Sequence, residues 1–269
     1  MDAYYELLDA DDPLGERFEA SDHVISTWSP DMQGAAPVSA LLVRALQRCE
    51  PRPDTRLSRV VVDLLGPVPV NGPLWMRAAR RRAGTKIELL SAEMLAPGPD
   101  GNPRPVAEAR AWRFQEHDTT ELVFTPDPPL RPRAEATARP AGAQRPGTPT
   151  FIDTLDWRWL NDILNSVPAE CWVRSKVDLV KGEAATPLER LFCIADIANG
   201  MGSRMDVRQW TFLNTDLTVH LHRLPVGDWF GIRAQTSYGP DGVGTSVGTL
   251  FDEAGPVGAI QQAQLVRRR

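Results

Sequence analysis

The feature that most constrains the fold is a repeat between the two halves of the chain. The segment PVNGPLWMRA, which begins at Pro69, aligns without a gap on PVGDWFGIRA, which begins at Pro225. The alignment also matches Arg77 to Arg233. Similarity at one fixed offset is typical of a duplicated unit, so the chain is predicted to contain two copies of one fold.

The boundary between the copies is marked by a change in composition. From residue 117 to 150 the chain is rich in proline, arginine and alanine and has no helical or strand periodicity, which predicts an extended linker. We therefore expect a first unit over residues 1–115, a linker over 116–150 and a second unit over 151–269.

Both halves are predicted to contain the same elements, one buried helix followed by four antiparallel strands that form a meander. In the first half these are a helix over residues 37–46 and strands over 57–65, 73–82, 86–95 and 105–114. In the second half a strand over 171–180 precedes a helix over 186–200, and strands follow over 211–222, 229–237, 244–251 and 257–267. The predicted class is α+β, with a sheet wrapped around one long helix in each unit.

The helix over 186–200 carries a carboxylate next to its apolar face. Thr186 and Glu189 form a T-x-x-E capping box, and Gly200 ends the run. Asp196 lies beside Phe192 at the flank of the apolar stripe, where burying an unpaired carboxylate is costly. Two hypotheses remain open: Asp196 is the ion-pair partner of an arginine, or it is a functional group at the edge of a cavity.

The strand over 211–222 is predicted to have one strongly polar face. Strict alternation places Asn214, Thr218, His220 and His222 together on that face. The two histidines have no third ligand at a metal-binding spacing, so we predict a hydrated or interface face and no metal site.

Composition excludes several classes of function. The formal net charge of −5 and the absence of a basic stripe argue against nucleic-acid binding. No apolar run is long enough to span a membrane, and the acidic N-terminal segment does not have the regions of a signal peptide. Three cysteines without metal-ligand spacing are expected to be free thiols, which favours a cytoplasmic protein.

Several segments together resemble the double hot-dog acyl-CoA thioesterases, in particular the type II enzymes and their thioesterase-like relatives. The resemblance spans essentially the whole chain. It is carried by Asp196 in the second helix and by four further segments: MQGAAPVSALLVRAL, LLGPVPVNGPLWMRA, DLTVHLHR and VGAIQQAQLVR.

The resemblance implies a site in which an Asp, a Thr and a Gln position the water that attacks a thioester. Asp196 matches the Asp and Gln262 matches the Gln, while Asn214 stands where the family has Thr. Thr215 or Thr218 would take the third position only if the strand were shifted. Gln262 and Gln264 share a strand face, so the alternative that both are merely exposed stays open.

The candidate substrate contacts are Gly34, Thr218 and Phe192. Gly34-Ala35 stands where the family has a Gly-Gly pair, and the start of the first helix near Gly34 is the expected site for the thioester oxygen. The resemblance implies an acyl-CoA partner, a role in fatty acid metabolism and no cofactor. Homo-oligomers through a remaining sheet edge or face are also expected.

Other functions fit less well or remain as alternatives. A hot-dog hydratase of the kind that adds water to enoyl-CoA would have a His five residues after an Asp, whereas Met201 follows Asp196 at that distance. No G-x-S-x-G elbow of a serine hydrolase is present. The alternative left open is a non-catalytic acyl-CoA-binding or lipid-binding double hot-dog.

Overall fold

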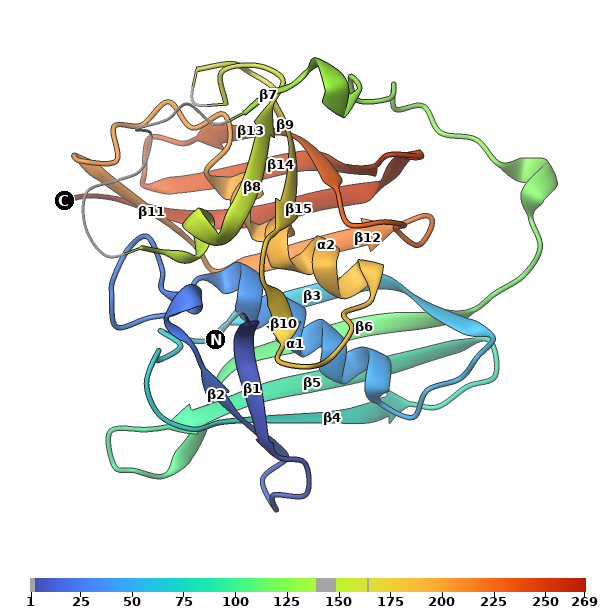
Figure 1. The fold of residues 1–269 in the computed structure, drawn as a ribbon, viewed down its shortest axis with the longest axis vertical. Coiled ribbons are helices and arrows are strands. Elements are labelled where there is room, and N and C mark those ends of the chain that lie inside the picture. Colours follow the sequence, from blue (N-terminus) through green and yellow to red (C-terminus); the bar gives the residue numbers. More distant parts are fainter. Residues whose placement is uncertain (1–2, 139–148, 164) are drawn as a thin grey trace.

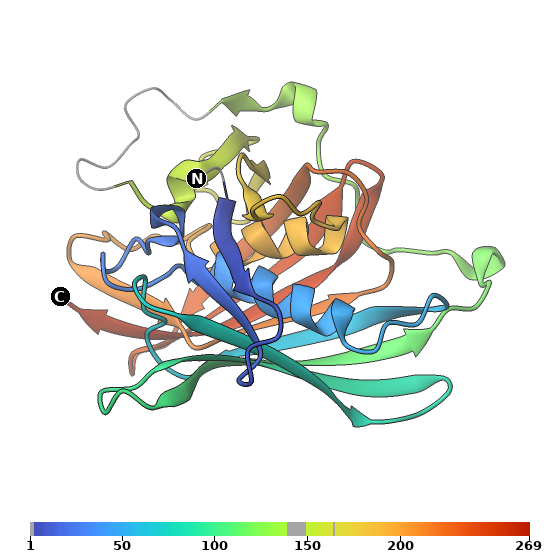
Figure 2. The same ribbon diagram turned by 60° about the horizontal axis from the view of Figure 1, so that its bottom comes forward.

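The protein forms one strongly curved, mostly antiparallel sheet with two helices on its inner side (Figure 1, Figure 2). The structure, a computed structural model, describes residues 3–138, 149–163 and 165–269. Successive strands in the sheet are ordered β10-β1-β2-β4-β5-β6-β3-β12-β15-β14-β13-β9-β8-β7. The sheet is therefore continuous across both halves of the chain.

The first half supplies one side of this sheet and the longer helix, α1 (Ala35–Arg48). Residues 36–46 of α1 are all buried, which the near absence of a polar face predicts. The strands of this half are β1 (Ala3–Asp9), β2 (Glu16–Ala20), β3 (Thr55–Leu64), β4 (Leu74–Arg82), β5 (Ile87–Pro97) and β6 (Pro103–Gln115).

The second half repeats this arrangement, so that on each side of the β3–β12 contact the equivalent strands follow one another in the same order outward. Its strands are β8 (Leu155–Trp159), β9 (Ala169–Ser175), β12 (Asp216–Leu221), β13 (Phe230–Tyr238), β14 (Val243–Asp252) and β15 (Gly255–Arg268). Strand β4 holds one copy of the sequence repeat and β13 the other, and each lies three strands from the β3–β12 contact. The repeat therefore marks equivalent positions in the two halves.

Three further strands complete the sheet: β10 and β11 belong to the expected strands over 171–180 and 211–222, each of which is split in two, and β7 has no expected counterpart. Strand β11 (Trp210–Asn214) pairs with β15, β10 (Asp178–Val180) pairs in parallel with β1, and β7 (Thr137–Ala138) pairs with β8. The β1–β10 pair joins the N-terminal strand to the segment that precedes the second helix. The two halves are thus connected at this edge as well as through β3 and β12.

The predicted four-strand meander is wrong in one respect. Strands β4, β5 and β6 do form a meander, but β3 pairs with β6 and not with β4, for example through Val60 opposite Ala111. The second half has the same arrangement, because β12 pairs with β15. This pairing leaves the outer edges of β3 and β12 free to meet each other, with Leu217 opposite Val62.

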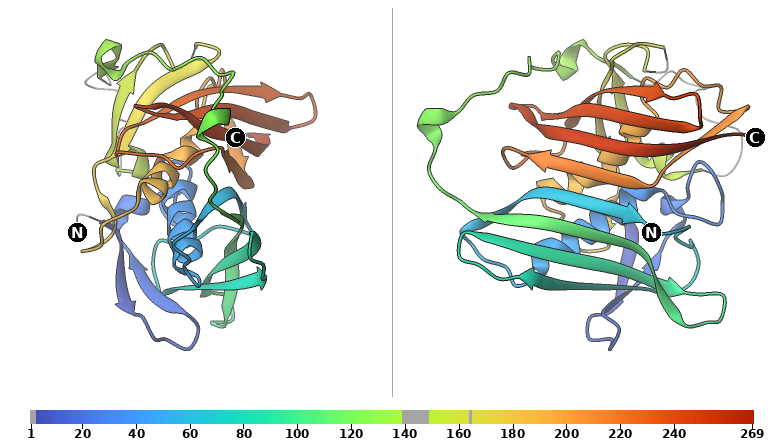
Figure 3. Two further views of the ribbon diagram at one scale, coloured as in Figure 1. Left: turned by 90° about the vertical axis from the view of Figure 1, so that its right-hand side faces the viewer. Right: turned by 180° about the vertical axis from the view of Figure 1, so that it is seen from behind.

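The second helix is shorter than predicted. Helix α2 (Pro187–Ala195) is followed directly by a 3-10 helix, η5 (Asp196–Asn199), so the expected helical run changes its geometry at Asp196. The predicted capping box is present, with the Glu189 amide 3.2 Å from Thr186 Oγ1 and the Thr186 amide 3.0 Å from Glu189 Oε2. Figure 3 shows α1 and α2 side by side inside the curve of the sheet.

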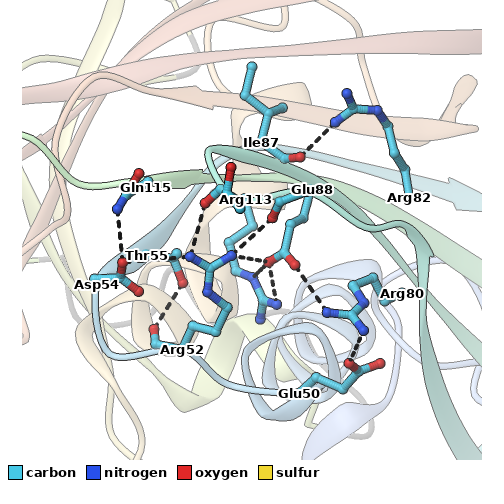
Figure 4. A network of polar contacts seen from close by, with 12 residues as sticks. Glu50, Arg52, Asp54, Thr55, Arg80, Arg82, Ile87, Glu88, Arg113 and Gln115 are labelled. Carbon is cyan, nitrogen blue, oxygen red and sulfur yellow. Dashed lines mark hydrogen bonds and ion pairs between the residues drawn. The ribbon is translucent and has the colours of Figure 1, made fainter.

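Two buried ion-pair clusters fix the helices and the sheet. Arg44 of α1 is 1% exposed, and it donates to Glu16 of β2 and to Glu183 of the loop before α2. At the far end of the first half, Glu88 accepts from Arg113 and Arg80 (Figure 4). Charges that are buried in this way are tolerated because each is paired and hydrogen-bonded.

The expected linker is partly packed against the second half. Short 3-10 turns occupy Thr120–Leu122 (η2) and Arg133–Glu135 (η3), and a third, Phe151–Thr154 (η4), leads into β8. Leu130 is buried with Trp172 and Trp229. The segment before residue 139 is therefore a structured strap, and the part of the predicted linker over residues 139–148 lies outside the described residues.

One further 3-10 turn, Asp22–Val24 (η1), lies between β2 and α1. Cys49, Cys171 and Cys193 are free and buried. Among the residues that the structure describes, no helix is long and apolar enough to cross a membrane.

Candidate active site

Asp196 lies at the junction of α2 and η5, where it is 5% exposed. Its Oδ1 accepts a hydrogen bond from Asn214 Nδ2 at 2.7 Å and another from Gln262 Nε2 at 2.9 Å. Within the described ranges, no arginine, lysine or histidine forms an ion pair with it. The hypothesis that Asp196 is the ion-pair partner of an arginine is therefore wrong as far as the described residues are concerned.

The protonation of Asp196 follows from this environment. Burial raises the pKa of Asp196 from 3.8 to about 6, because the charged form loses its contact with water. The hydrogen bonds from Asn214 and Gln262 oppose this effect by stabilising the carboxylate. A carboxylate with such a pKa is a proton acceptor near neutral pH.

Asn214 reaches Asp196 because its strand contains an irregularity. The step from Asn214 to Thr218 is four residues, while the matching step on β15, from Gln264 to Gln261, is three. An extra residue of this kind is a β-bulge, and it reverses the alternation of side chains. Asn214 therefore lies on the interior side, whereas Thr218 stays on the opposite face.

A cavity of about 520 Å³ lies next to Asp196. Polar groups in its wall include Asp196, Asn199, Asn214 and Gln33. Its aromatic lining consists of Trp28, Phe151, Trp157, Trp159 and Phe212. Most of the remaining wall is aliphatic, so the cavity is an apolar chamber with a few polar groups close to one carboxylate.

The start of α1 forms another part of the cavity wall, through Gly34 and Ala35. The Gly34 amide donates to the Val24 carbonyl at 2.7 Å and is therefore not available to a substrate. A Cβ at position 34 would lie 2.4 Å from the Phe151 ring, which explains the glycine. The next amide, that of Ala35, begins the helix, where backbone N–H groups have no partner inside the helix.

Gln262 and Gln264 both point inward from β15, with exposures of 1% and 2%. The alternative that they are exposed is therefore wrong. Gln262 Nε2 donates to the carboxylate and the carbonyl oxygen of Asp196, and Gln264 Nε2 donates to Ser246 and to the Asn199 carbonyl. The Oε1 atoms of both side chains are buried and have no hydrogen-bond partner among the described residues.

The site brings together only some of the predicted residues. Asp196, Asn214 and Gly34 line the cavity. Gln262 donates to Asp196 but is not among the described residues that line the cavity. Thr218 is excluded by the bulge, and Phe192 is packed in the core at 0% exposure. Neither is among the described residues that line the cavity, so the expected contacts of Thr218 and Phe192 with substrate are not supported by this geometry.

The sequence alone does not give Asn199 a role, and it places the oxyanion site near Gly34 without singling out the Ala35 amide. Asn199 was visible as an amide on the apolar stripe of the second helix, which is the same signal that singled out Asp196. The aromatic wall gives no signal in the sequence, because its residues come from three separate segments, around Trp28, around 151–159 and around Phe212. Within the described residues, no group of three or more histidine, cysteine, aspartate or glutamate side chains could hold a metal ion.

Similar solved structures share this fold at low sequence identity. A hot-dog protein of unknown function from Alicyclobacillus acidocaldarius is 15% identical, with a TM-score of 0.68 and coverage of 94% of this chain and 93% of that one. A protein from Thermobifida fusca, provisionally assigned as a thioesterase II, is 15% identical with a TM-score of 0.70 and coverage of 98% and 96%. An acyl-CoA thioesterase II from Mycobacterium marinum is 14% identical, with a TM-score of 0.67 and coverage of 98% and 96%.

These similarities show a hot-dog fold. No curated protein matches this chain in sequence. Two family models do match it: the acyl-CoA thioesterase N-terminal domain over residues 24–114 and the acyl-CoA thioesterase C-terminal domain over residues 128–266. Since the matched segments cover most of the chain, the protein belongs to the acyl-CoA thioesterase family.

Proposed function

We propose that the protein is an acyl-CoA thioesterase in which Asp196 activates the attacking water. The observation that carries the proposal is a buried carboxylate that lines an apolar cavity and has no cationic partner among the described residues. Family membership supports the thioester as the bond that is hydrolysed.

The cavity accommodates the acyl group in this proposal. Its wall is largely apolar and aromatic, which favours transfer of a hydrocarbon chain out of water by about 0.8 kcal/mol per buried methylene. The thioester carbonyl would then lie between Asp196 and the start of α1, because both border the same cavity.

Asp196 acts as the general base. Both hydrogen bonds from Asn214 and Gln262 go to Oδ1, and within the described part of the chain Oδ2 accepts none. Oδ2 is thus the atom that receives the proton of a water in the cavity. General base catalysis of this kind contributes roughly 10²–10⁴-fold in rate.

The Ala35 amide stabilises the negative charge that develops on the thioester oxygen. It lies at the N-terminus of α1, where unpaired N–H groups and the helix dipole favour an anion. Removing one such donor from an enzyme typically costs about 10²–10³-fold in kcat. The departure from the family's Gly-Gly pair keeps this donor, since alanine has the same backbone N–H.

Asn214 and Gln262 hold the carboxylate. Asn214 Nδ2 bridges Asp196 Oδ1 and the Asp216 carbonyl, and Gln262 Nε2 bridges Oδ1 and the carbonyl oxygen of Asp196 itself. Both are therefore positioning residues for the base. They fix the rotamer of the carboxylate and leave Oδ2 without a hydrogen bond among the described residues.

A hydrolysis assay over straight-chain acyl-CoAs from short to long tests the function. The proposal predicts release of free CoA thiol from at least one chain-length class, well above the rate without enzyme. Binding of acyl-CoA without turnover in every class would instead identify a non-catalytic acyl-CoA-binding protein and would reject the proposal.

A further inference from the structure

Asn199 lies one turn of 3-10 helix after Asp196 and lines the same cavity. A 3-10 helix has about three residues per turn, so side chains at positions 196 and 199 point in the same direction. Asn199 is also buried, with 9% of its surface exposed. Two polar side chains are thus directed from η5 toward one region of the cavity.

The amide of Asn199 is held in one orientation. Its Nδ2 donates to Asn214 Oδ1 at 2.9 Å, and its backbone carbonyl accepts from Gln264 Nε2 at 3.2 Å. The Nδ2 is therefore committed to a protein partner. Oδ1, which accepts no hydrogen bond within the described part of the chain, is the polar atom that this side chain presents to the cavity it lines.

The Asn199–Asn214 bond is not needed to orient Asn214. Asn214 Nδ2 already donates to Asp196 Oδ1 and to the Asp216 carbonyl at 3.2 Å, and both of these atoms act as acceptors. These bonds alone determine which end of the Asn214 amide faces Asp196. The bond from Asn199 therefore serves mainly to orient Asn199 itself.

Gln262 is less suited than Asn199 to contact a water in the cavity. Its Nε2 is used by Asp196, and its Oε1 is fully buried. It is also absent from the described cavity wall. Asn199 also has its Nδ2 committed to a protein partner, but its side chain lines the cavity, so its unused acceptor oxygen is available to a water there.

On the basis of the thioesterase function proposed above, we propose that Asn199 Oδ1 and Asp196 Oδ2 together accept the two hydrogens of the attacking water. A water that donates both hydrogens keeps a lone pair free, and that lone pair attacks the thioester carbon. A donor in place of either acceptor would instead engage a lone pair of the water and compete with its attack. Two acceptors are therefore the arrangement that suits a nucleophilic water.

The step balances as follows. One O–H bond of the water breaks and its proton moves to Asp196 Oδ2, while the water oxygen forms a bond to the carbonyl carbon. When the tetrahedral intermediate collapses, the C–S bond breaks and the proton on Asp196 moves to the leaving sulfur. The products are a carboxylic acid and the free thiol; the second water hydrogen stays bonded to its oxygen as the O–H of the acid, which donates to Asn199 Oδ1 until the acid departs.

The test compares Asn199→Ala with the wild-type chain. Loss of the acceptor leaves the water poorly oriented, so kcat is expected to fall by roughly tenfold or more, while KM for acyl-CoA stays within about twofold. The pH midpoint of the rate is expected to stay near that of the wild type, because Asn214 and Gln262 still hold Asp196. Thermal unfolding shows that the variant is folded.

Asn199→Asp provides a conservative variant that keeps an acceptor oxygen at the same position. Its plateau kcat is expected to exceed that of Asn199→Ala. The plateau is reached at higher pH, because a second carboxylate one turn away disfavours the charged form of Asp196. No charged group contributes to the existing pKa shift of Asp196, so this change is readily recognised. Thr218→Val is the control, since Thr218 is not among the described residues that line the cavity and its substitution should leave kcat within about twofold.

Three results would overturn the inference. The first is a kcat for Asn199→Ala within about threefold of wild type, which would leave the thioesterase function intact. The second is a fall in kcat with a shifted pH midpoint, which would show that Asn199 acts through Asp196. The third is a folded wild-type chain that turns over no acyl-CoA, which would remove the proposed function and this inference with it.

Discussion

Asn214 Nδ2 lies 2.7 Å from Asp196 Oδ1, and this contact joins the strand before the bulge to the end of the second helix. The two residues are 18 positions apart, and they meet only because the extra residue between β11 and β12 turns Asn214 inward. The contact stabilises the charged form of Asp196 against the cost of burial.

The first prediction concerns this contact. Asn214→Leu removes the donor, so the pKa of Asp196 should rise above about 6 and the acid limb of the pH–rate profile should move to higher pH. The measurement is kcat/KM for one acyl-CoA between pH 5 and 9. Thr218→Val is the matched control, because Thr218 lies on the opposite face, and an equal shift in both variants would contradict the assignment.

The second prediction concerns the stability of the fold. A buried carboxyl whose pKa is raised from 3.8 to about 6 destabilises the folded state above pH 6, by about 3 kcal/mol. Below pH 4 the group is protonated in both states and the penalty disappears. Asp196→Asn should therefore raise the free energy of unfolding at pH 7 to 8 relative to wild type.

This gain in stability should decrease between pH 6 and pH 4. Denaturant unfolding at pH 4 and pH 7.5 measures the difference directly. A variant that is less stable than wild type at pH 7.5 would show that Asp196 is a structural group, which is the opposite of its proposed role.

The third prediction concerns the close approach of Gly34 to Phe151. A Cβ at position 34 would lie 2.4 Å from the Phe151 ring, so Gly34→Ala must displace a ring that forms part of the cavity wall. Overpacking of this kind costs about 1–3 kcal/mol. Gly66→Ala is the control, because it also lines the cavity but its Cβ would meet no atom within 4 Å. Equal losses of stability in both variants would refute the packing argument.

The fourth prediction concerns the cluster around Glu88 (Figure 4). Arg113 and Arg80 donate to this carboxylate and hold its pKa below the ordinary value of 4.5. A depressed pKa stabilises the fold above about pH 4.5, and this contribution is lost as pH falls below that value. Glu88→Gln leaves the buried Arg113 unpaired and should cost about 3–5 kcal/mol at pH 7.

The loss should be smaller at pH 3, where the wild-type carboxyl is itself becoming protonated. Glu93→Gln is the matched control, because Glu93 pairs with the exposed Arg77 and surface pairs contribute about 0–1 kcal/mol. A Glu88 variant no less stable than the Glu93 variant at pH 7 would argue against a structural role for the cluster.

The repeat and the helix of the first half could be predicted from the sequence because their signals are local. Arg77 and Arg233, which the repeat aligns, lie on the equivalent strands β4 and β13, and each pairs with a glutamate. The apolar segment of α1 has to be covered on all sides, and the sheet and α2 together cover it. The local pattern of apolar residues and the repeat are therefore sufficient to predict these elements.

The strand pairing and the bulge could not be predicted in the same way. The pairing of β3 with β6 depends on contacts more than forty residues apart, such as that between Val60 and Ala111. The bulge near Thr215 depends on the register of β15, which no alternation within residues 211–222 reveals. Strict alternation therefore places Thr218 on the same face as Asn214, and only the register of β15 separates the two.

The measurement that tests the central claim most directly is the turnover of Asp196→Asn. Asparagine keeps the size of the side chain and an oxygen that accepts from Asn214 and Gln262, but it cannot take up a proton at neutral pH. At a pH well above 6, the account predicts that kcat with the best acyl-CoA falls by about 10²-fold or more, in a variant at least as stable as wild type. An active wild type whose kcat is unchanged in Asp196→Asn would contradict the account.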